Sequence, residues 1–409
     1  MEYKLNEESK KILYVSTRLP YPLVGGDKLR MFNNLKQLKQ IGYNITLVSL
    51  VSDDDDIDGA KNNNEFYDRF IPIKFNKKLA YLNAVKAVFN DRPFIVQYFY
   101  SSKMQKVIDD LLQKEHFDIV TGYMIRVLPY FEKHKNQNII VDIVDAVSMM
   151  YERRFKNKKS LFDKLKIGVE FLKVKNYEKK CARFSKKQVV ISDIDKNYLE
   201  KNSSDFNISV IENGVDTEYY VPCQCEKKNN ICFVGSMQYI PNSEAAMYFA
   251  TEIFPLIKNE IPDAKFKIIG ANPRKELFEA TNHIKGIDIT GKVDDVREYM
   301  KDCKVSVCPV KIAGGVQNKV LEAMSMGMPV VTTVEGSEGI GADENTLRVV
   351  KSNEEYAKEV LSLLKDAETV NRIGNESRRF ILEKFSWQEV GNGWNCVIKE
   401  VLDNEKNRD

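Results

Sequence analysis

Short apolar segments alternate with segments of helical periodicity along this chain, and this alternation restricts its fold more than any other feature. Residues 11–16 (KILYVS) and 44–51 (NITLVSLV) are apolar runs of strand length, and apolar residues recur at helical spacing between them. A strand, a helix and a strand in this order are typical of a parallel α/β sheet. The same alternation continues through FDIVTG, NIIVDIV and KQVVIS.

A second series of strand-like segments begins at residues 230–236 (NICFVGS) and continues through AKFKIIG, KVSVCPV and MPVVTT. A chain of 409 residues exceeds one ordinary core, so we predict two doubly wound domains. An Asn-Gly pair and a proline interrupt the chain within 210–222, before the second series. We predict an N-terminal domain over 1–208, a C-terminal domain over 209–385, and a helical segment over 386–409 that could cross back to the first domain.

The segment AGGVQNKVLEAMSMGMPVVT (313–332) places a basic and an acidic residue three apart at the start of a predicted helix. Ligands of open parallel sheets bind beyond the carboxyl ends of the strands, where helix N-termini offer free N–H groups. The first helical turn, which contains Lys319, can hold a diphosphate. Glu322, one turn further on the same face, can accept two hydrogen bonds from a ribose diol. A plain helical ion pair between Lys319 and Glu322 fits the residue types equally well.

Segments spread over most of the chain resemble a known family. They are residues 16–33, 190–195, 210–220, 233–249, 268–273, 290–300 and 314–331. Together they resemble the retaining glycosyltransferases of family four, the glycosyl transferases group 1, and in particular the branch found in exopolysaccharide gene clusters. The resemblance implies an α/β GT-B fold with two facing Rossmann-like doubly wound parallel-sheet domains and a C-terminal helix.

The resemblance also implies where an activated sugar binds. It makes Glu322 the carboxylate that holds the nucleotide ribose, and Gly25 and Gly26 a loop near the donor phosphates and the acceptor. Glycines let the backbone approach a ligand closely, although ordinary turn chemistry explains each residue as well. The predicted donor-binding residues are Gly25, Gly26, Gly235, Ser236, Gly270, Asn272, Gly314, Gly315, Val316, Gln317 and Asn318.

The chain departs from the family pattern in three places. The family's first glutamate, which usually grasps donor-sugar hydroxyls, falls on Gly314. The Arg and Lys pair that follows the first strand of the C-terminal domain is absent, and Tyr123 and Met124 stand where a histidine is common. We therefore take Lys319 as the cation that faces the leaving diphosphate and Arg18, just after the first strand, as a second cation.

Two carboxylates close the strand NIIVDIVD. We expect Asp142 and Asp145 to point toward the cleft, where they can orient an acceptor hydroxyl or accept its proton, although capping of the next helix fits equally well. The predicted catalytic residues are Lys319, Glu322, Asp145 and Arg18. The acidic run SDDDDID (52–58) suits a solvated loop, so we predict no metal site.

Residues 152–187 form a strongly basic segment. They contain fourteen Lys or Arg and four Asp or Glu, a net charge of +10, whereas the whole chain carries +3. Apolar residues interleave with these charges, as in a helix on an anionic lipid surface. A helix that packs an apolar stripe on the core and keeps its lysines in solvent fits equally well. No nucleic-acid-reading motif accompanies the charge, so we expect no nucleic-acid partner.

Hydropathy and cysteine usage predict a cytoplasmic protein. No run approaches the roughly 18 apolar residues of a membrane-spanning helix. The N-terminal residues contain no signal-peptide core, and the seven scattered cysteines are typical of reduced thiols. We expect a cytoplasmic location, with peripheral contact at the inner membrane face through residues 152–187.

The predicted activity is transfer of a hexose-type sugar from a nucleoside diphosphate sugar to a hydroxyl group. The acceptor is expected to be a saccharide or a lipid-linked molecule in surface-polysaccharide or glycoconjugate biosynthesis. The resemblance implies retention of anomeric configuration without a metal ion, and the donor is a co-substrate, so no cofactor is expected. A sugar-nucleotide 2-epimerase and a non-catalytic sugar-nucleotide-binding subunit are the alternatives. The sequence leaves the sugar, the base, the linkage and the oligomeric state open.

Overall fold

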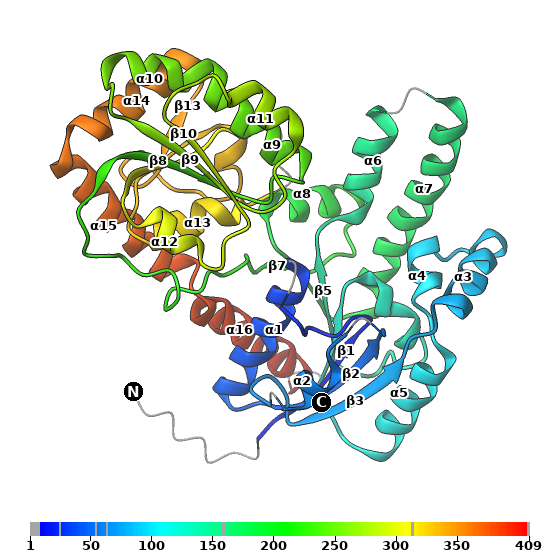
Figure 1. The fold of residues 1–409 in the computed structure, drawn as a ribbon. Coiled ribbons are helices and arrows are strands. Elements are labelled where there is room, and N and C mark those ends of the chain that lie inside the picture. Colours follow the sequence, from blue (N-terminus) through cyan, green and yellow to red (C-terminus); the bar gives the residue numbers. More distant parts are fainter. Residues whose placement is uncertain are drawn as a thin grey trace. The chain divides into compact units, whose positions relative to one another are not determined.

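The chain forms two compact units, each built on one parallel sheet (Figure 1). The computed structural model describes residues 9–23, 26–53, 55–62, 64–157, 160–311 and 315–406. Unit 1 comprises Met1–Asn213 and Val390–Asp409, and unit 2 comprises Gly214–Glu389. The predicted α/β class with two Rossmann-like sheets and a C-terminal helix is confirmed.

The sheet of unit 1 has the strand order β3-β2-β1-β4-β5-β6-β7. Its strands are β1 (Lys11–Ser16), β2 (Asn44–Val51), β3 (Arg69–Lys74), β4 (Ile119–Tyr123), β5 (Ile139–Val144), β6 (Lys187–Val190) and β7 (Ile208–Val210). All neighbouring strands run parallel. The central strands are buried over nearly their whole length, because helices cover both faces of a parallel sheet.

The helices of unit 1 connect these strands in chain order. They are α1 (Gly26–Ile41), α2 (Ile57–Asn62), α3 (Lys77–Lys86), η1 (Ala87–Phe89), α4 (Phe94–Tyr98), α5 (Ser102–Lys114), η2 (Ile125–Tyr130), α6 (Val147–Asn157), α7 (Leu161–Phe184) and α8 (Asp193–Asn202). Helix α5 is a clear case of amphipathic packing, since it buries Met104, Ile108 and Leu111 at helical spacing against the sheet. Figure 1 shows α6 and α7 side by side as a helical hairpin, with Phe155 of α6 against Gly168 of α7.

The sheet of unit 2 has the strand order β10-β9-β8-β11-β12-β13. Its strands are β8 (Lys228–Val234), β9 (Lys265–Ile269), β10 (Ile287–Gly291), β11 (Cys303–Cys308), β12 (Val330–Thr333) and β13 (Arg348–Val350). The connecting helices are α9 (Ile240–Tyr248), the π-helical turn η3 (Phe249–Ile253), α10 (Phe254–Glu260), α11 (Lys275–Thr281), α12 (Val296–Met300), α13 (Asn318–Ser325), η4 (Glu335–Ser337), α14 (Asn353–Lys365) and α15 (Ala367–Lys384). The strands run parallel, and their side chains form one continuous apolar core with these helices.

The last helix, α16 (Trp387–Lys406), begins in unit 2 and continues in unit 1 from Val390 onward. Within unit 1, Tyr43 donates a hydrogen bond to Asn395 at 2.7 Å, and the buried ammonium of Lys187 pairs with Glu400 at 2.7 Å. The two units divide after Asn213 and after Glu389, whereas the sequence places boundaries after residues 208 and 385. No helix among the described residues has the length and apolar character needed to cross a bilayer.

Candidate functional site

Unit 2 has a switch point between β8 and β11. Strands β8, β9 and β10 follow one another outward in one direction, and β11, β12 and β13 follow in the other. The loops that leave the carboxyl ends of β8 and β11 therefore diverge, and a crevice opens between such loops in doubly wound sheets. The predicted donor-binding residues that the structure describes in this unit follow β8, β9 or β11, at this edge of the sheet.

Helix α13 begins at Asn318, close to the start predicted from the sequence. The side chain of Gln317 makes no capping hydrogen bond to the helix. Its amide nitrogen donates instead to the Gly315 carbonyl at 2.9 Å, and its amide oxygen accepts from Lys319 Nζ at 2.8 Å. The first N–H groups of a helix lack intrahelical partners, so this end of α13 offers N–H donors and one cation together.

Lys319 joins the two strands of the switch point. It belongs to the helix that follows β11, and its Nζ atom lies 5.8 Å from the ring centroid of Phe233, near the end of β8. An ammonium over an aromatic face is held in place by the ring quadrupole. Lys319 thus connects the helix after β11 with the end of β8, and its contact with a phosphate stays a prediction.

Glu322 lies one turn after Lys319 and is half-buried rather than turned into solvent. The hydroxyl of Tyr220 lies close enough to its carboxylate for each group to shift the pKa of the other. Burial raises the pKa of Glu322, while Lys319 and the Tyr220 hydroxyl act in the opposite direction. A partly desolvated carboxylate beside a phenol can accept hydrogen bonds from the hydroxyl groups of a ligand. A surface ion pair would not require this burial.

Glycines bring the loops after β8 and β9 into contact. A Cβ atom built on Gly270, whose φ is +153°, would stand 1.8 Å from the carbonyl oxygen of Gly235. No side chain fits at position 270, which therefore requires glycine, whereas a Cβ atom on Gly235 would meet the side chain of Asn242 at 2.7 Å. Ser236 and Asn272 are exposed beside them, and Asn272 adopts a left-handed φ of 54°. The four residues lie at one edge as predicted, and their contact with a donor stays a prediction.

Two other loop predictions are affected by the structure in different ways. The side chain of Val316 is partly buried and packs against the core of unit 2. Gly315 adopts a φ of +101°, which favours glycine. Gly25 and Gly314 lie outside the described residues. Gly26 is the first residue of α1.

Arg18 and Asp145 both lie at the carboxyl edge of the unit 1 sheet. Arg18 follows β1 and pairs with Asp27 in the first turn of α1, with 2.7 Å between Nη1 and Oδ2. Asp145 follows β5, where burial and the neighbouring Asp195 carboxylate raise its pKa to about 6. The N–H of Ala146 donates to Asp195 and that of Ser148, in the first turn of α6, donates to Glu178, so neither group is capped by Asp145.

The expectation that Asp142 points toward a ligand is wrong. Its side chain is completely buried in unit 1, where Arg30 Nε approaches at 3.1 Å and Asn34 donates at 3.3 Å. An aspartate in the middle of a buried strand has to find internal partners, because an unpaired buried carboxylate is costly. Asp142 is therefore part of the interior of unit 1.

Comparison with known proteins connects this geometry to a family. Residues 228–366 match the model of the glycosyl transferases group 1. An uncharacterised 44.6 kDa protein of the cps region of Klebsiella pneumoniae is 24% identical over 95% of this chain and 99% of its own length. The matched range contains β8 to α14, and thus both Lys319 and Glu322.

Solved structures of other proteins have a fold similar to that of this chain. A sucrose-phosphate synthase from Thermosynechococcus elongatus superposes with a TM-score of 0.67 at 14% identity, over 97% of this chain and 100% of the other. HepE from Anabaena, solved in complex with UDP, gives a TM-score of 0.64 at 11% identity, over 95% and 100%. The match of residues 228–366 supports a glycosyltransferase domain of group 1 over this range, and the solved structures show a GT-B-like fold for the chain.

The sequence analysis predicted no role for two residues that the structure draws attention to, namely Tyr220 beside Glu322 and Arg126 in unit 1. Tyr220 stands about a hundred residues before Glu322 in the chain, and only the packing of unit 2 brings them together. Arg126 follows β4 in a stretch that carries no recognisable motif. Its place directly after a predicted strand was the one available signal.

Proposed function

We propose that this protein transfers a hexose-type sugar, with retention and without a metal ion, from a nucleoside diphosphate sugar to a saccharide or lipid-linked hydroxyl. The observation that carries the proposal is the placement of Lys319 and Glu322 one turn apart on α13, beside the β8–β11 switch point. The helix N-terminus and Lys319 would hold the diphosphate, and Glu322 the ribose. The complex of HepE with UDP supports a nucleoside diphosphate as ligand of such a fold.

The stereochemistry, the metal independence and the pathway in this proposal are supported by different observations. Retention and metal independence rest on the family resemblance. A role in surface-polysaccharide biosynthesis is supported by the likeness to a protein of the cps region. Asp145, which is an exposed residue although its carboxylate is partly desolvated, would orient the acceptor hydroxyl. The comparisons give no support to a 2-epimerase.

Replacing Glu322 by glutamine should weaken binding of the nucleotide. Hydrogen bonds to a charged acceptor contribute about 1.5–3 kcal/mol each, so the Kd should rise roughly ten- to hundredfold. Calorimetric titration with UDP, GDP and dTDP would identify the nucleotide that the wild type binds and then measure the variant. Because the Tyr220 hydroxyl lies beside the carboxylate and acts on its pKa, Tyr220→Phe should give a smaller loss of affinity.

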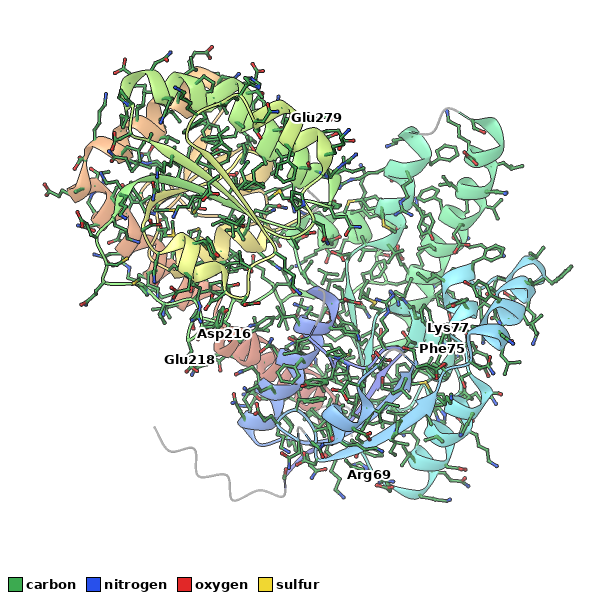
Figure 2. All side chains as sticks on the ribbon, viewed as in Figure 1. Arg69, Phe75, Lys77, Asp216, Glu218 and Glu279 are labelled. Carbon is green, nitrogen blue, oxygen red and sulfur yellow. The ribbon has the colours of Figure 1, made fainter. Side chains whose placement is uncertain are left out.

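Glu279→Gln is the matched control for Glu322→Gln. Glu279 is exposed on α11 of the same unit and pairs with Lys275 one turn away, and Figure 2 labels it. Its replacement should leave nucleotide binding unchanged. If Glu322→Gln bound the nucleotide as tightly as the wild type, the proposed donor site would be wrong.

We also propose peripheral contact with an anionic membrane through residues 152–187. Helix α7 divides into two parts: Val174, Tyr177 and Cys181 pack on the core, whereas Leu165 and Leu172 are 67% and 59% exposed. The C-terminal half of the helix therefore packs on the core, whereas the N-terminal half leaves apolar side chains exposed.

The neighbouring turn η1 extends this exposed apolar surface. Lys173 of α7 donates to the carbonyl oxygens of Ala87 and Asn90, which ties η1 to the helix, and Phe89 between them is 86% exposed. Residues 75–90 contain three lysines and no acidic residue. Exposed aromatic and aliphatic side chains among lysines favour an anionic lipid surface.

Flotation with vesicles tests this membrane contact. The protein should float with vesicles of phosphatidylcholine and phosphatidylglycerol more than with phosphatidylcholine alone, and less so at high salt. Phe89→Ser and Leu172→Ser should each lower the partition coefficient by about tenfold, because each side chain contributes roughly 1.5–3 kcal/mol when buried. Leu256→Ser, an exposed leucine of α10, is the control. Equal flotation with both kinds of vesicle would contradict the proposal.

A further inference from the structure

Unit 1 has its own switch point, between β1 and β4, and two arginines stand on either side of it. The strand order runs β1-β2-β3 in one direction and β4-β5-β6-β7 in the other. Arg18 follows β1, and Arg126 follows β4 in η2. Both therefore lie at the edge where a doubly wound sheet binds its ligand.

The two guanidinium groups share one aromatic ring. Arg126 Cζ lies 4.8 Å and Arg18 Cζ 6.0 Å from the ring centroid of Phe99. Phe99 is held by a stacked contact with Phe75, whose ring centroid is 5.5 Å away and which Figure 2 labels. Contact with this ring thus holds two positive charges near each other. An anion bound between the two guanidinium groups would reduce their electrostatic repulsion.

The two arginines differ in their partners. Arg18 is paired with Asp27 at 2.7 Å and remains 47% exposed. Arg126 is half-buried, and its Nη1 atom is enclosed without a hydrogen-bond partner among the described residues. Burial, and next the charge of Arg18, lower the pKa of Arg126 to about 10. An enclosed donor without an acceptor is costly, so such a group calls for a ligand.

The backbone before Arg126 is strained. Met124 adopts a φ of 64° and a ψ of 159°, a region that residues with side chains rarely occupy. Its N–H donates to the Asp142 carbonyl at 2.7 Å, and the preceding Tyr123 hydroxyl donates to the Asp27 carbonyl at 2.8 Å. These bonds fix the turn that leads to Arg126. Strain of this kind concentrates at ligand sites.

We propose that Arg126 and Arg18 bind an oxyanion carried by the acceptor sugar. The inference rests on the proposed glycosyl transfer and names the acceptor class: a saccharide with a phosphate ester or a carboxylate. A guanidinium offers parallel N–H donors that match either group. Arg126 supplies the unpartnered donor, and Arg18, partly neutralised by Asp27, supplies the second charge.

Binding measurements with simple sugars test the proposal without any turnover. Glucose 1-phosphate, methyl glucuronide and neutral methyl glucoside would be titrated calorimetrically into the full chain, with UDP present in excess to fill the donor site. At least one anionic sugar should bind about tenfold or more tightly than the neutral one, since a charge-assisted bidentate contact contributes that much. Comparing the affinities for glucose 1-phosphate and methyl glucuronide shows whether the site prefers a phosphate or a carboxylate.

Substitutions then assign the binding to the arginines. Arg126→Gln should remove the preference for the anionic sugar, and Arg126→Lys should keep part of it. Arg18→Gln, at an exposed position, should lower the preference even if Arg126 variants fold poorly. Arg69→Gln is the matched control. Arg69, labelled in Figure 2, is the first residue of β3 and so lies at the amino end of the strands, where it pairs with Glu115.

The outcomes separate this inference from the proposed function. We expect Glu322→Gln to lose nucleotide binding and to keep anion binding. We expect Arg126→Gln to lose anion binding and to keep nucleotide binding. Equal binding of neutral and anionic sugars, or an unchanged preference in both Arg126→Gln and Arg18→Gln, overturns the anion site. Nucleotide binding by a protein that transfers no sugar would overturn the proposed function and leave the anion site standing.

Discussion

Replacement of Lys319 by alanine is expected to lower kcat for sugar transfer by about a hundred- to a thousandfold. Negative charge develops on the leaving diphosphate as the bond to the sugar breaks, and Lys319 is the cation that begins α13 at the β8–β11 switch point. The charge is larger in the transition state than in the bound donor. The Kd of the donor should therefore change less than kcat, by about tenfold or less.

The comparison with two further variants makes this test specific. Lys319→Arg keeps the positive charge but changes its geometry, so kcat should recover in part. Lys365→Ala, which removes an exposed lysine of α14 paired with Glu260, should leave kcat unchanged. Single-turnover measurements would separate the chemical step from product release. A Lys319→Ala enzyme with wild-type kcat would show that another group stabilises the diphosphate.

The sequence predicted the buried strands of both sheets but missed the four at their edges. The named segments correspond to β1, β2, β4, β5 and β6 in unit 1 and to β8, β9, β11 and β12 in unit 2. The strands that escaped, β3, β7, β10 and β13, are the first and last strands of the two sheets. A central parallel strand is buried on both faces and reads as a continuous apolar run, whereas an edge strand carries polar residues or proline, as RFIPIK of β3 does.

The candidate site could be predicted only where its residues lie on one element. Lys319 and Glu322 belong to one helix, so their spacing alone places them on one face. Tyr220 and Arg126 reach their sites through tertiary packing, which no local pattern encodes. Asp142 was misjudged because a strand residue near the carboxyl end can turn inward as well as outward, and its partner Arg30 is 112 residues away.

Removal of the Arg30 side chain is expected to cause the largest loss of stability. Arg30 is 1% exposed and pairs with the completely buried Asp142 at 3.1 Å, and its other nitrogens donate to the carbonyls of Ile211 and Glu212 and to the side chain of Asn213. Arg30→Met leaves a buried carboxylate and several acceptors unpaired, which costs about 3–5 kcal/mol. For a unit of this size, the Tm should fall by roughly 10 °C.

Tryptophan fluorescence can follow unit 1 selectively, because the chain has two tryptophans and only Trp394 belongs to that unit, where it is completely buried. In a Trp387→Phe background, the thermal transition therefore reports the unfolding of unit 1. Arg69→Gln breaks an exposed ion pair and should change stability by less than about 1 kcal/mol. The double variant Arg30→Met/Asp142→Leu should unfold at a higher temperature than Arg30→Met, since it also removes the buried carboxylate that has lost its arginine partner. A double variant no more stable than Arg30→Met would mean that the contacts to 211–213, rather than the ion pair, determine the loss.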